Sequence, residues 1–351
     1  MLDLTVIEKN YNCRVLDFLL LSAGRKIYKL QTNKGDFVLK NVNFPEAEFT
    51  FIQEACGYLA EQGCRAAAVV PKTDGDFCFE VPKGKRSERY FLMRYIDGKT
   101  ADFSSGEDIV LLAEALAKLH QKSFGFHCEV FPDRNKIGDF ADNVSTKIND
   151  MKKWQDCLKT KGDLEYFDFL YTGYTARYIN LSLQVLESLQ NYYGDISRKY
   201  ESTGCICHHD LANHNILIDR SRTEAADMVG FVDFDYCIAD VFVHDLASVL
   251  LRLGKENRYE TELPLKFLEK YEEFLPLEDG ERRLLWDYLR FPQGFWQLGL
   301  AFYEELPRMK DLKKQKIRKG RLDRRLTDYM DTAEDKHKFL QTLRSRIICG
   351  C

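Results

Sequence analysis

CHHDLANHNILID spans residues 207–219 of the 351-residue chain, and GFVDFDYCIADVFVHDL spans residues 230–246. Two short apolar runs, residues 216–218 and 230–232, lie on either side of a polar break. Such a pattern predicts a β-hairpin. Asp210 and Asn215 precede the first strand and Asp233 follows the second, so the hairpin would bring two acids and an amide to one place.

These residue types suit phosphoryl transfer. A carboxylate at Asp210 could orient and deprotonate an attacking hydroxyl group, while Asn215 and Asp233 offer hard oxygen ligands to the Mg²⁺ that bridges ATP phosphates. We therefore predict that Asp210 and Asn215 are catalytic and that Asn215 and Asp233 are metal ligands. The alternative is a chance D-x-x-x-x-N followed by an Asp-Phe-Asp turn.

A lysine strand far upstream argues against coincidence. Residues 26–30 and 36–40 are β-like runs around Asn33-Lys34-Gly35, which favours a tight hairpin connection. Because side chains alternate along a strand, Val38 and Lys40 share one face. With the downstream acids present, we expect Lys40 to reach the α- and β-phosphates of ATP and Val38 to line the adenine site. Without them, Lys40 would be an ordinary lysine at a strand end.

The segment before this hairpin contains a single glycine. Ser22-Ala23-Gly24 could bring backbone N–H groups near a triphosphate, and Gly24 is therefore a candidate nucleotide-binding residue.

The two motifs resemble a known family. Residues 208–215 resemble the H-G-D-x-x-x-x-N loop of the aminoglycoside phosphotransferase and choline kinase superfamily, which is related to the H-R-D loop of protein kinases. Together with residues 232–235 and 244–246, they look like the CotS-type spore-coat proteins, a kinase-like branch found in spore-forming bacteria. The resemblance extends, with gaps, from about Gly24 to the C-terminal helices.

The resemblance implies an α+β, protein kinase-like fold with two lobes. Residues 1–96 would form a small antiparallel β-sheet lobe that binds nucleotide. Residues 97–351 would form a larger, mainly helical lobe with the catalytic loop, the metal site and the acceptor pocket. Strand signals largely cease after Gly98, which agrees with this boundary.

The resemblance also implies roles for single residues. The strand at 89–96 resembles the superfamily's hinge, so the main chain of Met93, Tyr95 and Ile96 would contact adenine. Asp235, where protein kinases have Gly, is typical of small-molecule kinases of this superfamily, and we count it as a metal ligand.

A helix is predicted over residues 45–62, with Gly63 as its stop signal. By resemblance, this helix should supply a Glu that pairs with Lys40. The candidates are Glu46, Glu48 and Glu54, among which we favour Glu48. The alternative is that all three are solvated helix charges.

Two further polar residues concern the geometry of the motifs. Asp245 could accept hydrogen bonds from the catalytic-loop backbone or from His208 and so position Asp210; the alternative is a helix N-terminal acid stabilised by the helix dipole.

Ser104 and Glu107 fit a capping box for a helix that ends near His120. We expect His120 to be a packed, hydrogen-bonded core residue.

Composition limits the other possibilities. The chain is longer than one usual core, and its net charge of −4 gives no general attraction to nucleic acid or anionic membrane. No apolar run reaches the ~20 residues of a membrane span, and MLDLTVIEKN lacks a signal-peptide pattern, so we expect synthesis and retention on the cytosolic side. The 11 cysteines are read as reduced thiols.

Two features have open interpretations. The pairs Cys205/Cys207 and Cys349/Cys351 lack the spacing of a zinc knuckle, and crosslinking of the C-terminal pair in an assembled coat is a separate possibility. Basic residues crowd within 308–325, either as a solvated helix face or as a contact for an anionic polymer or coat component.

The leading hypothesis is an ATP- and Mg²⁺-dependent phosphotransferase acting on the hydroxyl group of a small molecule that the sequence does not name. The alternative is a structural spore-coat component with a kinase-like fold and little or no turnover. Location in the spore coat, with other coat proteins as partners, follows only from the resemblance. A third hypothesis, nucleic-acid binding through residues 308–325, is disfavoured by the acidic net charge.

Overall fold

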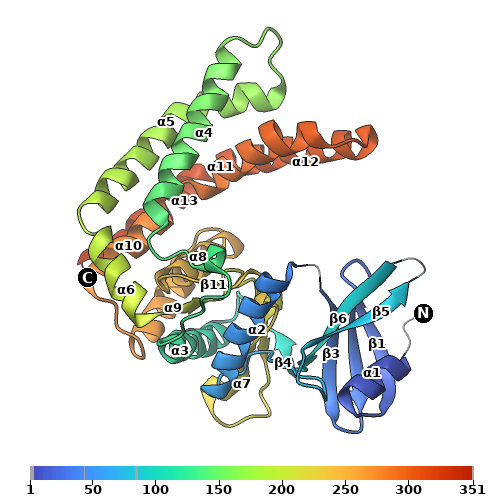
Figure 1. Cartoon of the computed structure of the whole chain (residues 1–351). Helices are drawn as coiled ribbons and strands as arrows, with labels where there is room; N and C mark the ends of the chain where they lie inside the picture. Colours follow the sequence, from blue (N-terminus) through green and yellow to red (C-terminus); the bar gives the residue numbers. More distant parts are fainter. Residues whose placement is uncertain (1–3, 43, 84–85, 350–351) are drawn as a thin grey trace. The chain divides into compact units, whose positions relative to one another are not determined.

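The alternating runs near the N-terminus form an antiparallel sheet of six strands in the computed structural model, which describes residues 4–42, 44–83 and 86–349 (Figure 1). The chain divides into two compact units. The first contains residues 1–135, 203–245 and 266–276, and the second contains residues 136–202, 246–265 and 277–351. Each unit is described by itself.

The sheet is built largely from neighbouring strands and hairpins. Its strands are β1 (Val15–Ser22), β2 (Ile27–Thr32), β3 (Gly35–Asn41), β4 (Val69–Val70), β5 (Cys78–Lys83) and β6 (Arg86–Arg94). Their order is β1-β2-β3-β6-β4, with β5 also paired to β6. The predicted hairpin around Asn33 is confirmed: β2 and β3 are antiparallel, with Ile27 opposite Lys40. Gly35 begins β3 with φ +107°, a conformation that glycine adopts without strain.

Two helices pack on the sheet. Helix α1 (Leu4–Tyr11) places Ile7 and Tyr11 in one apolar cluster with Leu30, Leu39 and Leu92 of the sheet. Helix α2 (Glu46–Glu61) contributes Phe49 to a second cluster, which includes Phe91 and Met93 of β6. The helix predicted over residues 45–62 is therefore confirmed, and it ends before Gly63, whose φ is +77°.

The rest of the first unit holds the motifs. Short strands form two small sheets, with the order β10-β9-β7 in one and the pair β11-β8 in the other. These strands are β7 (Lys99–Thr100), β8 (Ile206–Cys207), β9 (Ile216–Ile218), β10 (Val229–Phe231) and β11 (Ile238–Ala239). The helices are α3 (Gly106–Ser123), α7 (Ala225–Met228), the start of α8 (Val243–Glu256) and most of α9 (Glu262–Glu272).

The predicted capping box at the start of α3 is wrong by one residue. Ser105, and not Ser104, is the N-cap, and its hydroxyl accepts a hydrogen bond from the backbone N–H of Asp108. Ser104 instead donates its hydroxyl to the Asp102 carboxylate at 2.6 Å. Neighbouring serines offer the same capping group, so the sequence pattern did not separate them.

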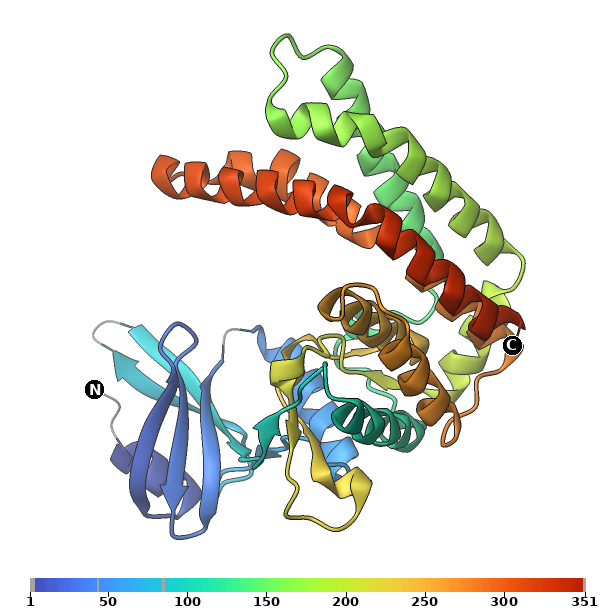
Figure 2. The ribbon, with the colours of Figure 1, turned by 180° about the vertical axis from the view of Figure 1, so that it is seen from behind.

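The second unit is helical throughout its regular structure among the described residues. Helices α4 (Phe140–Lys159) and α5 (Tyr166–Gln190) run side by side (Figure 2). The unit also contains most of α8 and the start of α9. Its other helices are α6 (Tyr193–Thr203), α10 (Asp279–Arg290), α11 (Gln293–Gly299), α12 (Leu312–Asp331) and α13 (Ala333–Cys349). A π-helical turn at Leu300–Glu305 follows α11.

The α+β class, the antiparallel N-terminal sheet and the mainly helical remainder are confirmed. The lobe boundary between residues 96 and 97 stays a prediction, because the two compact units are divided at other positions in the chain. No helix in the described ranges combines the length and the apolar character that a membrane crossing requires.

Candidate active site

Short strands bring the two motifs together. The loop that contains Asp210 lies between β8 and β9, and the loop that contains Asp233 lies between β10 and β11. Strand β9 pairs with β10, and β8 pairs with β11, so both ends of each loop are tied to the other loop. The backbone N–H of Val232 also donates to the carbonyl of Asn215 at 3.0 Å. The predicted hairpin is confirmed.

Gly230 allows this hairpin to approach the end of the larger sheet. A Cβ atom at this position would collide with the side chain of Ile96. Only glycine leaves the space that Ile96 occupies.

Asp245 fixes the backbone of the loop that contains Asp210. Its carboxylate is fully buried and accepts the backbone N–H groups of His208 at 2.6 Å and His209 at 2.8 Å. His120 lies 3.4 Å away through Nε2 and contacts the Tyr271 hydroxyl through Nδ1 at 2.7 Å. The predicted role of Asp245 in the loop backbone is thus confirmed, and His120 is the packed core residue that we expected.

The environment of Asp245 keeps it ionised. Burial alone would raise the pKa of its carboxyl group, but the hydrogen bond from His120 and the backbone N–H of His209 outweigh burial and lower the pKa to about 2. A carboxylate held by backbone donors cannot move without unfolding the loop.

His208 connects the two loops. Its ring is fully buried against Phe234, with 4.4 Å between ring centroids. Nε2 donates to the carbonyl of Val232 at 2.9 Å, and Nδ1 accepts the backbone N–H of Asp210 at 3.3 Å. His208 therefore sets the distance between the backbone of Asp210 and the strand that leads to Asp233.

The side chain of Asn215 is oriented by hydrogen bonds to Asp210. It is almost fully buried, and its side-chain N–H₂ group donates to the carbonyl oxygen of Asp210 at 2.9 Å and to the Asp210 carboxylate at 3.2 Å. Since the amide nitrogen is used in this way, the amide oxygen is the group that remains for a metal ion.

Lys40 reaches the second motif. Its buried ammonium group lies 2.6 Å from the Asp233 carboxylate and also contacts the Asp235 carboxylate. Arg25, whose side chain is 58% exposed, pairs with the other oxygen of Asp233 at 2.9 Å. One lysine and one arginine therefore neutralise two adjacent acids in this structure.

The two acids titrate differently. Burial acts to raise the pKa of the Asp233 carboxyl, but Lys40 and Arg25 outweigh it and hold this pKa below its ordinary value. For Asp235, burial and the negative charge of Asp233 raise the pKa of the carboxyl, although Lys40 opposes them. Asp233 is also held at φ +65°, a left-handed backbone conformation that is costly for a non-glycine residue.

The predicted pairing of Glu48 with Lys40 is wrong in this structure. Glu48 contacts the guanidinium group of Arg134, a residue that our sequence analysis did not single out. Arg134 is buried, and it also donates to the carbonyl oxygen of Cys237 at 2.7 Å and to that of Asp235 at 2.8 Å. Arg134 thus joins α2 to the loop that carries two of the three predicted metal ligands, Asp233 and Asp235. No sequence pattern marks it, since it lies in a segment without clear periodicity.

The other proposed nucleotide-binding residues are placed as follows. Val38 lies opposite Met93 in the sheet, and Lys40 lies two residues further along β3. Both Val38 and Met93 pack in the apolar cluster that includes Ile96. The backbone N–H of Tyr95 donates to the carbonyl of Asp36 at 3.3 Å.

Gly24 lies between β1 and β2, and a Cβ atom there would meet nothing within 4 Å. The nucleotide-binding roles of Gly24, Val38, Met93, Tyr95 and Ile96 stay predictions.

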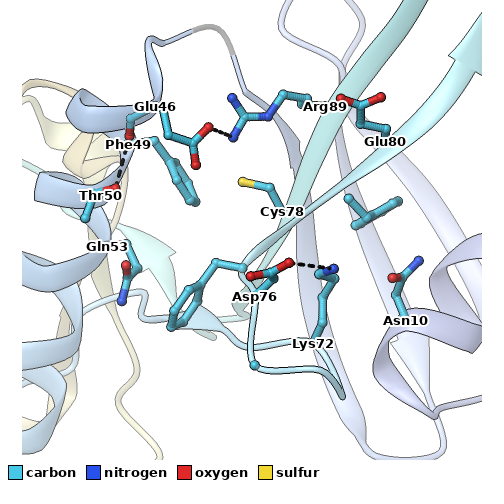
Figure 3. Close-up of a pocket in the computed structure, with 13 residues that line it drawn as sticks. Asn10, Glu46, Phe49, Thr50, Gln53, Lys72, Asp76, Cys78, Glu80 and Arg89 are labelled. Carbon is cyan, nitrogen blue, oxygen red and sulfur yellow. Dashed lines mark hydrogen bonds and ion pairs between the residues drawn. The ribbon is translucent and has the colours of Figure 1, made fainter.

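A separate cavity of about 690 Å³ lies between α2 and β5 (Figure 3). Its lining includes Phe49, Cys78 and two ion pairs: Glu46 with Arg89 at 2.7 Å, and Lys72 with Asp76 at 3.5 Å. No predicted catalytic, nucleotide-binding or metal-binding residue lines it.

Comparisons with known proteins find related chains. The chain is 26% identical to the endospore coat-associated protein YutH of Bacillus subtilis (strain 168) over 288 residues, which cover 81% of the chain and 79% of that protein. It is 21% identical to spore coat protein S of the same organism over 284 residues, which cover 80% and 78%. The similarity to spore-coat proteins that the motifs predict is therefore found.

Solved structures show the same fold. An aminoglycoside phosphotransferase from Alicyclobacillus acidocaldarius has a TM-score of 0.77 at 20% identity, covering 99% of this chain and 96% of the other. A spectinomycin phosphotransferase, solved with ADP and spectinomycin, has a TM-score of 0.63 at 12% identity, covering 96% and 97%. The model of the phosphotransferase enzyme family matches residues 21–286, which include Lys40 and both motifs. Because this match covers more than half of the chain, the chain belongs to the phosphotransferase enzyme family, as its two motifs predict.

Proposed function

We propose that the chain transfers the γ-phosphoryl group of ATP, with Mg²⁺, to the hydroxyl group of a small molecule. The observation that carries this proposal is the contact of Lys40 with Asp233 and Asp235, which are 193 and 195 residues away in the sequence. A buried lysine and two adjacent carboxylates from separate segments are the parts that phosphoryl transfer needs.

The residues fit a divalent metal ion. Asp233 and Asp235 share the Lys40 ammonium group, and Arg25 also pairs with Asp233, so the two adjacent acids already attract cations. Together with the Asn215 amide oxygen they form an all-oxygen donor set, which Mg²⁺ prefers. When bound, Mg²⁺ would neutralise charge on the phosphates.

Each remaining residue then has one task. Lys40 would pair with the phosphates, and Asp210 would accept the proton of the acceptor hydroxyl group. Asn215 holds the Asp210 carboxylate in place by its hydrogen bond of 3.2 Å. His208 and Asp245 hold the backbone of the loop. Catalysis would consist of positioning and charge neutralisation, without a covalent enzyme intermediate.

The test is ATP consumption by the purified protein with a panel of amino alcohols, sugars and aminoglycosides. We expect Asp210→Asn to lower turnover by about 1,000-fold, because it removes the base, while Mg-ATP affinity changes by less than about threefold. Asp219→Asn is the matched control, since Asp219 lies at the turn of the same hairpin and bonds Ser221 and Arg222. Unchanged turnover in Asp210→Asn would refute the assignment.

A second candidate is a structural coat component that keeps the fold and has little or no turnover. The names of the two relatives, both coat proteins, favour it, and they also support a location in the spore coat with other coat proteins as partners. The two candidates differ in turnover, and nucleotide binding gives a second comparison. A rise in melting temperature with Mg-ATP that Asp233→Asn removes would support the enzyme, and its absence would support the coat component.

A further inference from the structure

Helices α5, α10, α12 and α13 of the second unit enclose a groove. It consists of two adjoining hollows that share Leu181, Arg290, His337 and Leu340, and the larger hollow has a volume of about 360 Å³. The groove lies wholly within one unit and contains none of the residues proposed for phosphoryl transfer.

The charged side chains that line the groove are all basic. Four lysine or arginine side chains and His337 line it, and neither hollow includes a carboxylate among its described lining residues. The four are Arg177, Arg290, Lys336 and Arg344. Arg290 pairs with the buried Asp287 through Nε at 2.7 Å. The other three form no ion pair with a described residue, so their charge is uncompensated.

The walls of the groove are aromatic and aliphatic. The Arg344 guanidinium group lies 5.8 Å from the ring centroid of Trp286, and the Lys336 ammonium group lies 5.4 Å from that of Tyr329. Leu181 and Leu340 complete the apolar surface. Lys336 is only partly exposed, and burial lowers the pKa of its ammonium group. A nearby negative charge would relieve this cost.

The cavity between α2 and β5 provides a contrast (Figure 3). There Arg89 and Lys72 are matched by Glu46 and Asp76, so the lining neutralises its own cations. In the groove the missing counter-charges must come from elsewhere. Cations gathered without counter-charges repel one another, and a bound anion removes that repulsion.

We propose that this groove is a binding site for an organic anion, a phosphate or carboxylate carried on an aromatic or aliphatic body. The anionic group would pair with Lys336 and Arg344, and the apolar body would pack on Trp286, Leu181 and Leu340. This site is independent of the proposed phosphoryl transfer.

The test uses phenyl phosphate as the probe, with the full-length protein and no nucleotide, in isothermal titration calorimetry. We expect saturable binding that is at least about tenfold tighter than that of inorganic phosphate or phenol, because both halves of the probe contribute. The double variant Lys336→Gln/Arg344→Gln should weaken binding by about tenfold or more, since it removes two charge-assisted contacts.

Two controls make the result specific. Lys313→Gln/Arg321→Gln removes the same charge from exposed positions of α12 and should leave affinity unchanged. Lys40→Gln should also leave it unchanged, which separates the groove from the candidate active site. The proposal is overturned if wild type does not bind phenyl phosphate, if Lys40→Gln abolishes binding, or if the two double variants behave alike. If phenol bound as tightly as phenyl phosphate, the proposal that the groove recognises an anionic group would be overturned.

Discussion

Asp245 and the pair Asp233/Asp235 are acids of the same unit, but their charges are balanced in opposite ways. Asp245 is fully buried and is held by two backbone N–H groups and a buried histidine. Asp233 and Asp235 are partly exposed and are held by the side chains of Lys40 and Arg25. Backbone donors are fixed by the fold, whereas side-chain cations can turn away.

This difference separates a structural acid from acids that are free to exchange partners. Lys40 and Arg25 contact Asp233 through their side chains, so exchanging them for a metal ion would break no backbone hydrogen bond. Replacing the donors around Asp245 would require the loop at His208 and His209 to unfold. The structure therefore predicts that Asp245 governs stability and that Asp233 and Asp235 govern metal-dependent binding.

The largest expected effect is that of Asp245→Asn on stability. One amide oxygen cannot replace two carboxylate oxygens, and the amide N–H₂ group would face N–H donors, so we expect a loss of about 3–5 kcal/mol in the free energy of unfolding. Urea unfolding followed by circular dichroism measures it. Asp233→Asn is the control and should change stability by less than Asp245→Asn does, because Lys40 keeps Asp235 as a partner. Equal stabilities of the Asp245 variant and wild type would contradict the structural role.

The next largest effect is expected for Asp233→Asn, on the Mg²⁺-dependent binding of ATP. Loss of one charged oxygen ligand should weaken Mg²⁺-dependent ATP binding by about 100-fold, while ATP binding without metal changes little. Titration calorimetry with and without Mg²⁺ measures both. If Mg²⁺ increases ATP affinity equally in the variant and in wild type, Asp233 is not a ligand.

The pH dependence of stability should distinguish the same two sites. The pKa of Asp245 falls from an ordinary 3.8 to about 2 on folding, so the unfolded chain takes up this proton more readily. Its contribution, about 2 kcal/mol, is present above about pH 4 and is lost as the pH falls toward 2. Unfolding midpoints of wild type and Asp245→Asn should therefore converge over this interval. A constant difference between them down to pH 2 would contradict the lowered pKa.

The smallest effect is expected at Arg134, which links α2 to the loop that contains Asp233 and Asp235. Arg134→Lys keeps the charge but cannot donate at once to Glu48 and to the carbonyls of Asp235 and Cys237. We expect the increase in ATP affinity that Mg²⁺ produces to be about tenfold smaller in the variant than in wild type, with the fold retained. Arg222→Lys, at the exposed turn of the hairpin, is the matched control. An unchanged Mg²⁺ requirement in Arg134→Lys would show that the link is only structural.

Much of the site followed from local patterns. The hairpin β9–β10, the strand that presents Lys40 and the helix α2 each depend on apolar spacing and turn residues within about 20 positions. The sequence offered two interpretations of Asp245, an acceptor for the backbone of the loop at Asp210 or a helix N-terminal acid, and the structure shows the hydrogen bonds of the first. The capping error at Ser104 and Ser105 shows the limit of such patterns, since neighbouring serines are equivalent in sequence.

Partners that are far apart in the chain could not be predicted in this way. Glu48 and Arg134 are 86 residues apart, and the preference of Glu48 for Arg134 over Lys40 depends on how α2, β3 and the loop before α4 meet. The groove of the second unit is a similar case, because Arg177, Arg290, Lys336 and Arg344 come from three helices with unremarkable sequences.

The sequence by itself predicted which groups would carry out phosphoryl transfer: Lys40, Asp210, Asn215, Asp233 and, by the family resemblance, Asp235. Only the tertiary structure decided which charges balance one another. The physical reason is that residue types and spacing set local geometry, whereas an ion pair depends on distance and burial, and both are products of packing between segments.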